Sequence, residues 1–547
     1  MFSDDEVLLN IMYSSNIPAG TEAIAFSKSS RWLTTGMKMN FRIYCSVTQK
    51  ECQGGRRSET PWWSKMSLAL AEKRLVGRLI GPYQREGVEW MLERETAQGI
   101  KGGFLCDEMG LGKTVEVIAT MLGNLKRRTL IIAPKSVLTQ WRDEVRKFTG
   151  RTLRVGVWDG PNRTSHSAVL AEMDVVITSY SLLIPRTGEK ATPLHRVTWD
   201  RLVLDEGHEV RNPKTKTFVS IRALKSNIQW IVSGTPIFNS IRDFASLCAI
   251  LGISQKQVQA QCENIRRTYV LRRTKQDVSE FNTRLALPNC DFDNVELEMN
   301  PEEKQLYNEV YANSKEKVRT LLRQNDKGTT MHILECLLRV RQTMIWPQLY
   351  YDGIAVKDDE DPLVFEGHSK KHDTLIELIK SHPKEKSLVF CQFVGEMDQI
   401  QLRLHNEKID VYRIDGSVSK EAREHRIESF KKSKTGAAFI IQIKAGGVGL
   451  NLQEATRVYI MSPAWNPATE LQAIARAHRT GQVNKVYIKK LVYAGNEEIP
   501  SIEESIMKLQ DSKALVCAEV LNDPRLSSQL PKTKSKYTIQ DLKRLFV

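Results

Sequence analysis

Short apolar runs alternate with amphipathic segments in two separate parts of this chain of 547 residues. Such runs, bounded by polar residues, predict buried strands, and the amphipathic segments between them predict helices. The predicted strands are 129–133, 175–178, 201–204 and 230–232 in the first part, and 387–391, 411–414, 437–443 and 457–461 in the second. Strands that alternate with helices form parallel sheets with right-handed crossovers. We therefore expect an α/β protein with two parallel-sheet lobes.

A polar cluster directly follows each predicted strand of the first part. The clusters are Pro134-Lys135-Ser136, Ser179-Tyr180, Asp205-Glu206-Gly207-His208 and Ser233-Gly234-Thr235-Pro236. Ligands of parallel α/β sheets bind outside the carboxyl ends of the strands. The clusters therefore predict a binding site at that edge of the first sheet.

Residues 104–114 predict a phosphate-binding loop. An apolar start is followed by two glycines, by Lys113 and Thr114, and by the helical run 115–122. Glycines let backbone N–H groups turn toward phosphate oxygens, a lysine neutralises phosphate charge, and a hydroxyl ligates Mg²⁺. The helix directs its positive end at the anion. Asp107 stands where the usual pattern has a glycine, so the loop taken alone leaves an ordinary glycine-rich turn as the alternative.

Asp205 and Glu206 supply the carboxylates that Mg²⁺-dependent phosphoryl transfer needs. Mg²⁺ uses few protein oxygens and keeps several waters, so one carboxylate can hold it directly or through water. The neighbouring carboxylate can polarise the attacking water. An Asp-Glu pair alone is usually a solvated turn, but its place after an apolar strand and its pairing with Gly-Lys-Thr favour the catalytic interpretation.

The second part of the chain contains no Gly-Lys-Thr of its own. Its last predicted helix carries Gln472, Arg476 and Arg479, and residues three apart share one face of a helix. We interpret this unit as a partner lobe whose arginines reach the nucleotide of the first lobe.

Composition favours a polyanionic partner such as nucleic acid, or an acidic membrane surface, because the net charge is +15 and the pI is about 9.2. A basic protein without such a partner is the alternative. The nine cysteines include no C-x-x-C pair, so we expect no structural zinc and a reducing compartment. The acidic start, residues 1–6, and the lack of an apolar run of about 18 residues predict an intracellular protein that does not enter a membrane.

The remaining segments set the expected domains. These are an unassigned region 1–77, a first lobe 78–290, a helical insertion and linker 291–367, a second lobe 368–495, and a bracing helix with a docking tail 496–547. Trp62 and Trp63 could stack on bases or pack against the next domain. The basic run 271–275 carries no assigned chemistry, and the acidic segment 352–367 is interpreted as a mobile linker.

Five motifs occur in the order typical of one family. They are Asp107-Glu-Met-Gly-Leu-Gly-Lys-Thr114, Asp205-Glu-Gly-His208, Ser233-Gly-Thr-Pro236, Lys444-Ala-Gly-Gly-Val-Gly-Leu-Asn-Leu452 and Gln472-Ala-Ile-Ala-Arg-Ala-His-Arg-Thr-Gly-Gln482. Over about 78–515 the chain resembles the Swi/Snf-type DNA-dependent ATPases of helicase superfamily two. Residues 90–95 and 541–546 are similar to the branch that contains the helicase-like transcription factor of post-replication repair. The resemblance implies two RecA-like lobes that flank an ATP cleft, with helical insertions.

The resemblance also implies a role for each matching residue. The residues implied to hold ATP are Gln84, which would sense adenine, and Asp107, Glu108, Met109, Gly110, Leu111, Gly112, Lys113, Thr114 and Gln482. The implied catalytic set is Lys113, Asp205, Glu206 and the arginine fingers Arg476 and Arg479, with Thr114 and Asp205 as ligands of Mg²⁺. The residues implied to couple nucleotide state to lobe closure are His208, Ser233, Gly234 and Thr235. The residues implied to face double-stranded DNA are Lys135, Ser136, Ser179, Lys444, Gly446 and Trp465.

Two departures from the family pattern stand out. Gly207 replaces the usual alanine, a loss of one methyl group that we expect activity to survive. Residues 324–370 contain one cysteine and two histidines, too few for the RING finger of the repair branch, so we expect no ubiquitin-ligase activity.

These features lead us to expect an ATP-dependent double-stranded-DNA translocase that remodels DNA or protein–DNA complexes in repair, replication or transcription. Its expected place is the nucleus, or the site of replication or transcription of a cell or a virus, with protein targets on the DNA. An RNA-stimulated helicase of the same superfamily and a non-hydrolysing DNA-binding scaffold are the alternatives.

Overall fold

The computed structural model describes residues 62–234, 241–279, 288, 290–324, 329–433, 436–443, 450–479, 481–495 and 499–521. All of them belong to one compact unit, Thr60–Val547. Three residues of the predicted site, Thr235, Lys444 and Gly446, lie outside the described residues, as do 1–61 and the tail 537–546.

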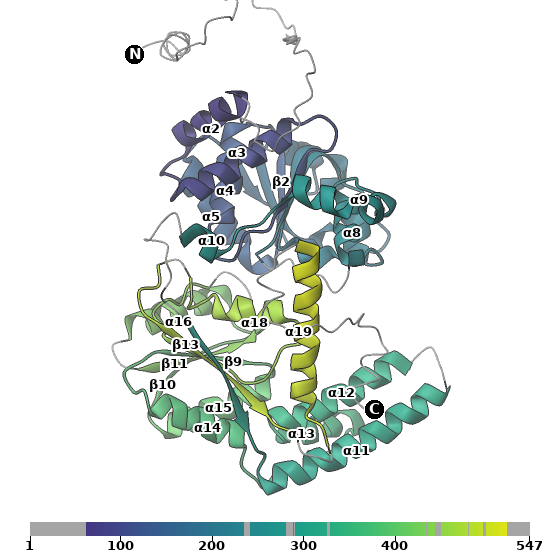
Figure 1. Ribbon diagram of the computed structural model, residues 1–547, viewed down its shortest axis with the longest axis vertical. Helices are drawn as coiled ribbons and strands as arrows, with labels where there is room; N and C mark the ends of the chain where they lie inside the picture. Colours follow the sequence, from purple (N-terminus) through teal and green to yellow (C-terminus); the bar gives the residue numbers. More distant parts are fainter. Residues whose placement is uncertain are drawn as a thin grey trace, which may run out of the picture. The chain divides into compact units, whose positions relative to one another are not determined.

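Among the described residues, seven parallel strands form a first sheet in the order β3-β4-β2-β5-β6-β1-β7 (Figure 1). The strands are β1 Gly102–Leu105, β2 Thr129–Ala133, β3 Val155–Val157, β4 Val175–Ser179, β5 Thr198–Asp205, β6 Lys225–Val232 and β7 Val270–Leu271. The four strands predicted here are present. β5 and β6 begin several residues earlier than predicted. Their first residues are mostly polar and partly exposed, so the apolar pattern that predicts a buried strand is missing there.

Side chains of the central strands alternate between two buried faces of this sheet. Phe104 and Leu130 pack into one apolar core with the residues of α7, α8 and α9. Leu105 and Ile131 pack into the other core with the residues of α2, α3, α4 and α5. Burial on both faces is the reason why these parallel strands are unbroken apolar runs in the sequence.

The helices of the first lobe carry these two cores. They are α2 Trp62–Arg74, α3 Pro82–Thr96, α4 Lys113–Gly123, α5 Leu138–Thr149, α6 Ser167–Ala171, α7 Lys216–Arg222, α8 Ile241–Ile250, α9 Gln255–Tyr269 and α10 Lys275–Ser279. Four 3₁₀ turns accompany them: η1 Lys135–Val137, η2 Tyr180–Leu183, η3 Pro193–Arg196 and η4 Gly207–Val210. Helix α3 begins at Pro82, since proline fits the first helical position.

The second sheet has six described parallel strands in the order β10-β11-β9-β12-β13-β8 (Figure 1). They are β8 Cys290–Leu297, β9 Ser387–Cys391, β10 Asp410–Ile414, β11 Ala437–Gln442, β12 Arg457–Ile460 and β13 Val486–Tyr493. The predicted α/β class with two parallel sheets is therefore confirmed. Strand β8 was not predicted and falls in the stretch assigned to a helical insertion, because most of its residues are exposed and polar.

Eight described helices accompany the second sheet. They are α11 Pro301–Gln324, α12 Thr329–Ile345, α13 Gln348–Asp358, α14 Lys370–Lys380, α15 Val394–Asn406, α16 Lys420–Lys432, α18 Pro467–Ile474 and α19 Ile502–Leu521. The interpretation of 352–367 as a linker is wrong for its first residues, which belong to α13: Pro347 ends one helix and caps the next. None of the described helices is both long and apolar enough to cross a lipid bilayer.

A buried ion pair fixes the amino-terminal edge of the first sheet. Arg201 on β5 donates from Nε to Glu95 Oε1 at 2.6 Å and from Nη2 to Glu95 Oε2 at 2.5 Å. Both side chains are buried. Glu95 also accepts from Trp230 Nε1 at 2.9 Å and from Asn124 Nδ2 at 2.6 Å, so one carboxylate joins α3, β5, β6 and the end of α4.

Replacing Glu95 with alanine should destabilise the first lobe by about 3–5 kcal/mol, because Arg201 is then buried without a counter-ion. Differential scanning calorimetry should show a melting transition lowered by several degrees. Arg154→Ala is the control, since Arg154 pairs with Asp174 at the surface and such pairs contribute little. Equal melting temperatures of the Glu95 and Arg154 variants would contradict this prediction.

Candidate functional site

The predicted site residues of the first lobe gather at the carboxyl edge of its sheet. β6 lies between β1 and β5, so the phosphate loop after β1, Ser233 after β6 and Asp205 at the end of β5 follow three neighbouring strands. Gly234 approaches the loop closely: a Cβ there would lie 2.4 Å from Met109 Cγ and 2.9 Å from Lys113 Nζ. A larger residue at this position would displace the side chains of Met109 and Lys113.

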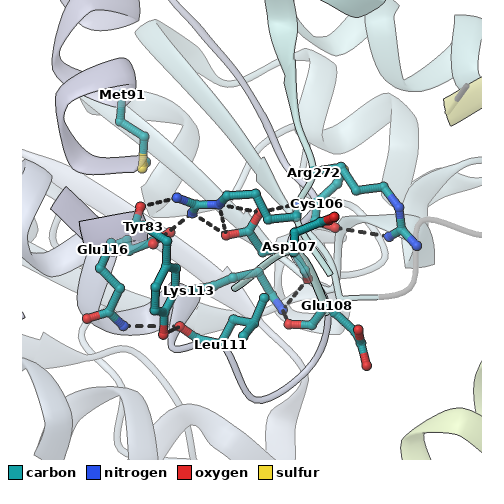
Figure 2. Close-up of polar contacts among 12 residues, drawn as sticks. Tyr83, Met91, Cys106, Asp107, Glu108, Leu111, Lys113, Glu116 and Arg272 are labelled. Atoms are coloured by element: carbon teal, nitrogen blue, oxygen red, sulfur yellow. Dashed lines mark hydrogen bonds and ion pairs between the residues drawn. The ribbon is translucent and has the colours of Figure 1, made fainter. Parts of the chain in front are cut away.

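The phosphate loop has the backbone that its glycines predict. Gly110 and Gly112 have φ angles of 90° and 86°, a region that favours glycine. Gly112 caps α4, whose first two residues are Lys113 and Thr114. Lys113 Nζ donates to the backbone oxygen of Asp107 at 2.8 Å and to that of Glu108 at 3.2 Å (Figure 2). The loop's own carbonyl groups therefore hold the ammonium beside the loop.

Gln84 ties helix α3 to the phosphate loop. Its Nε2 donates to the Leu111 oxygen at 3.0 Å, and its Oε1 accepts from the Ile80 N–H at 2.8 Å. Tyr83 donates its hydroxyl to the same Leu111 oxygen at 2.9 Å. Both ends of the buried Gln84 amide thus bind protein groups in this structure, and contact with an adenine stays a prediction.

Asp205 is held at the end of β5 by Trp141 of helix α5. Trp141 Nε1 donates to Asp205 Oδ2 at 2.7 Å, and Tyr180 donates its hydroxyl to the Asp205 backbone oxygen at 2.6 Å. Burial, and then the neighbouring charge of Glu206, raise the pKa of Asp205 to about 7, while Trp141 and Lys113 oppose that shift. A cation at this carboxylate would relieve the same cost.

Glu206 adopts a left-handed backbone, with φ of 51°, at the start of the turn after β5. His208 Nδ1 lies 3.3 Å from Glu206 Oε2 and 3.1 Å from Ser233 Oγ. Burial alone would raise the pKa of Glu206, but His208, Lys113 and Arg476 together lower it. Among the described residues no donor is aligned to hydrogen-bond Glu206 Oε2, although this atom is buried. The His208 ring is thus the polar group beside this oxygen, and contact of Glu206 with a water molecule stays a prediction.

The residues around Gly207 leave no room for a larger side chain. A Cβ at Gly207 would lie 2.6 Å from Ile231 Cγ2. The space of the alanine methyl group is therefore filled by the side chain of Ile231, which explains how the site keeps its packing without the family's usual residue.

The two arginines of the second lobe do not share a helical face, and that interpretation was wrong. Helix α18 ends at Ile474, so Arg476 and Arg479 lie in the turn beyond it. A long-range contact holds this turn, since the Arg476 oxygen accepts from the Leu452 N–H at 3.1 Å. Arg476 is buried; burial and then Arg479 lower the pKa of Arg476 to about 10, while Glu206 opposes the shift.

Gln482 organises this arginine turn from within. Its Nε2 donates to the oxygens of Gln453 at 2.8 Å and Ala477 at 3.1 Å, and its Oε1 accepts from the N–H groups of Val483 and Asn484. The amide is thus used inside the protein, and direct contact of Gln482 with a nucleotide stays a prediction.

The described residues predicted to face DNA differ in exposure. Lys135 and Ser136 are exposed on η1, directly after β2. Ser179 is only 2 % exposed, and its hydroxyl lies 3.3 Å from that of Ser181. Trp465 is partly buried, with the Arg341 guanidinium 5.6 Å from its ring centre. Only Lys135 and Ser136 of these four are thus clearly presented to solvent.

Comparison with known families places the whole arrangement. Residues 83–261 and 253–349 match the SNF2-related domain, and residues 370–481 match the helicase conserved C-terminal domain. The chain therefore belongs to the SNF2-related family, in which the second domain follows the first, and the family predicted from the motifs is confirmed.

Individual relatives agree with this assignment. The chain is 32% identical over 498 residues to YwqA of Bacillus subtilis (strain 168), a proposed ATP-dependent helicase/translocase, and the match covers 85% of this chain and 50% of YwqA. It is 27% identical to the helicase-like transcription factor of Homo sapiens, with 72% of this chain and 50% of the relative covered. It is 27% identical to the DNA repair protein RAD5B of Arabidopsis thaliana, with 82% and 47% covered. The chain spans about half the length of these curated relatives.

Among solved structures, the Sulfolobus solfataricus SWI2/SNF2 ATPase core in complex with dsDNA is 25% identical to this chain. The match covers 84% of this chain and 98% of that structure, with a TM-score of 0.37.

The residues present fit the predicted ATP and Mg²⁺. The positive φ angles of Gly110 and Gly112 open the loop, and a Cβ at Gly112 would lie 2.4 Å from Gln84 Nε2, so a larger residue would disturb it. Asp205 is a carboxylate whose ionisation is costly without a cation, and Glu206 keeps an oxygen without an aligned donor. This set suits a triphosphate and a hard cation.

Replacing Asp205 with asparagine should stabilise the fold at pH 8. The folded-state pKa of Asp205 is raised, so ionising it costs stability as the pH rises from about 4 through about 7, and the cost is complete above that. We expect a gain of about 1–4 kcal/mol at pH 8 and a smaller one at pH 5. Thermal unfolding at both pH values measures it.

Asp200→Asn is the control for this experiment, because Asp200 lies on the same strand at a distance from the site. Its melting temperature should stay close to that of the unchanged protein. If the Asp205→Asn protein is instead less stable than the unchanged protein at pH 8, the ionised Asp205 carboxylate does not cost the fold stability.

Proposed function

We propose that this chain is an ATP-hydrolysing translocase that moves along double-stranded DNA and remodels DNA or protein–DNA complexes, in repair, replication or transcription. The observation that carries the proposal is the phosphate loop with Lys113, next to Asp205 and Glu206 at one sheet edge, in a chain of the SNF2-related family. The names of relatives, a proposed helicase/translocase and a DNA repair protein, support it.

The residues of the first lobe divide the work on the nucleotide. The loop N–H groups and Lys113 bind phosphate oxygens, and Thr114 with Asp205 holds the metal. Mg²⁺, when bound with ATP, neutralises charge on the phosphate oxygens. Glu206 orients and polarises the attacking water molecule, since its pKa is lowered and it stays ionised. Hydrolysis of the terminal phosphoanhydride is the chemistry that this set supports.

The arginines of the second lobe complete the site. Arg476 and Glu206 each shift the pKa of the other in this structure, so their charges interact. An arginine finger contributes about 10³–10⁵ in turnover in related phosphoryl-transfer enzymes. Because the lysine and the carboxylates belong to one sheet and the arginines to the other, DNA that bridges both lobes would stimulate hydrolysis.

The net charge of +15 and the exposed Lys135 and Ser136 support a grip on the DNA backbone. Such contacts position a protein without reading sequence. We predict that binding to a duplex weakens by about 10³–10⁵ between about 50 and about 200 mM salt, as for ~6–10 phosphate contacts. Fluorescence anisotropy with duplexes of unrelated sequence measures both properties, and a strong sequence preference would contradict the prediction.

Lys113→Ala and Glu206→Gln should each lower DNA-stimulated ATP turnover by about 100-fold or more. Lys113→Ala should also weaken nucleotide binding, because it removes the phosphate-neutralising charge, whereas Glu206→Gln should retain it. A coupled ATPase assay measures turnover, and Glu189→Gln, on a loop outside the site, is the matched control. Unchanged turnover in both site variants would show that the turnover does not come from this site, and the chain would then be a non-hydrolysing scaffold.

The nucleic acid is tested in the same assay by comparing duplex DNA, single-stranded DNA and RNA at equal nucleotide concentration. We expect the duplex to stimulate most. Preferential stimulation by RNA would replace the proposal with an RNA-stimulated helicase.

A further inference from the structure

The basic run 271–275 extends the first sheet into the phosphate loop. Strand β7 pairs in parallel with the end of β1, with Leu105 opposite Leu271. Beyond both strands the pairing continues, because the Cys106 N–H donates to the Leu271 oxygen at 2.7 Å and the Glu108 N–H donates to the Arg273 oxygen at 2.9 Å. The backbone of this run therefore follows the loop residue by residue.

The side chain of Arg273 joins three elements around the loop. Its Nε lies 2.9 Å from Asp107 Oδ2, its Nη2 lies 2.8 Å from Glu116 Oε1, and its Nη1 donates to the backbone oxygen of Tyr83. Asp107 in the first half of the loop and Glu116 in the first turn of α4, both labelled in Figure 2, have fully buried side chains. One guanidinium thus bridges the two ends of the phosphate loop.

This arrangement explains how the loop accommodates Asp107, which stands where the general phosphate-loop pattern has a glycine. Two buried carboxylates face each other across the loop, and burial and then Asp107 raise the pKa of Glu116, an effect that Arg273 opposes. A guanidinium has five donors in a planar fork, which lets it bind both carboxylates and a carbonyl at once. Arg273 therefore offsets the charge that Asp107 introduces where a glycine would be usual.

Helix α3 is shaped to admit this guanidinium. A Cβ at Gly87 would lie 2.6 Å from Arg273 Nη2 and 2.9 Å from Glu116 Oε1. Gly87 lies inside α3, where glycine costs about 1 kcal/mol relative to alanine. A glycine that weakens its own helix and leaves room for a charged side chain indicates that the position of that side chain matters.

We propose that Arg273 is a positioning residue of the nucleotide site, which clamps the phosphate loop through Asp107 and Glu116 and so sets the place of Lys113. The proposal rests on the proposed function, since it assumes that the loop binds ATP. The connection to Lys113 passes through Asp107: the Lys113 ammonium donates to the backbone oxygens of Asp107 and Glu108, and the Arg273 guanidinium binds the Asp107 carboxylate. Glu108 is held by the backbone of Arg273, a contact that the alanine variant keeps.

The test measures the Kd of the intact chain for a fluorescent ATP analogue with Mg²⁺, together with the melting temperature. Arg273→Ala should weaken binding by about tenfold or more, because a bond to a charged group is lost at each end of the loop. Gly87→Ala should also weaken binding by about tenfold, because the new methyl group displaces the flexible Arg273 guanidinium. The melting temperature of this variant should stay the same or rise, since alanine favours the helix. Arg267→Ala is the control, an exposed arginine on α9 that should bind as the unchanged protein does.

Adding Asp107→Gly to Arg273→Ala should recover part of the lost affinity, because it removes the unneutralised carboxylate and restores the usual glycine. A merely structural ion pair would instead lower the melting temperature in Gly87→Ala and leave its Kd unchanged, and that result would overturn the proposal. If Arg273→Ala does not fold, Gly87→Ala decides alone. If the unchanged protein does not bind the ATP analogue, the proposed function is refuted and this inference with it.

Discussion

Lys113 lies among four carboxyl groups, and the first lobe depends on how their repulsion is offset. These groups are Asp107, Glu116, Asp205 and Glu206. Each is met by a donor from another element: Arg273 binds the two beside the loop, Trp141 binds Asp205, and His208 lies beside Glu206. Packing anions together in a partly desolvated place costs stability unless cations or hydrogen bonds compensate. The site is thus built to receive positive charge, and the protein supplies only part of it.

The parallel sheets determine which groups can meet. In such sheets every strand ends at the same edge, so loops far apart in the chain become neighbours there. In the first sheet this edge unites the phosphate loop after β1, Ser233 after β6 and the carboxylates after β5. The second lobe positions its charged groups differently. Its arginines lie in a turn that is held by hydrogen bonds to Gln482 and Leu452, rather than on a helix. Both solutions place charged groups on backbone that is restrained by hydrogen bonds.

The strands with two buried faces were predictable, because their apolar runs follow directly from that burial. Strand β8 was not, since its exposed residues carry no such pattern. The extent of α18 was predicted wrongly, and the hydrogen bond between Arg476 and Leu452 that holds the turn beyond it leaves no signal in the local sequence. The roles of Trp141 and Arg273 could not be predicted either. Their contacts join residues 64 and 166 positions apart, and only the folded sheet brings these together.

Strand β8 is the first strand of the second sheet in chain order, yet its partner β13 lies 196 residues later, as the pair Asp293 and Lys489 shows. During synthesis the β8 segment therefore has no β13 to pair with until almost the whole second lobe has left the ribosome. Long-range pairing of this kind is slow, and an unpaired strand can associate with another chain. The aspartates at 291 and 293 protect it, because charge on an exposed strand opposes such association. In the folded protein they form surface ion pairs with Lys485 and Lys489, so the charges that keep the nascent strand from association have partners in the finished sheet.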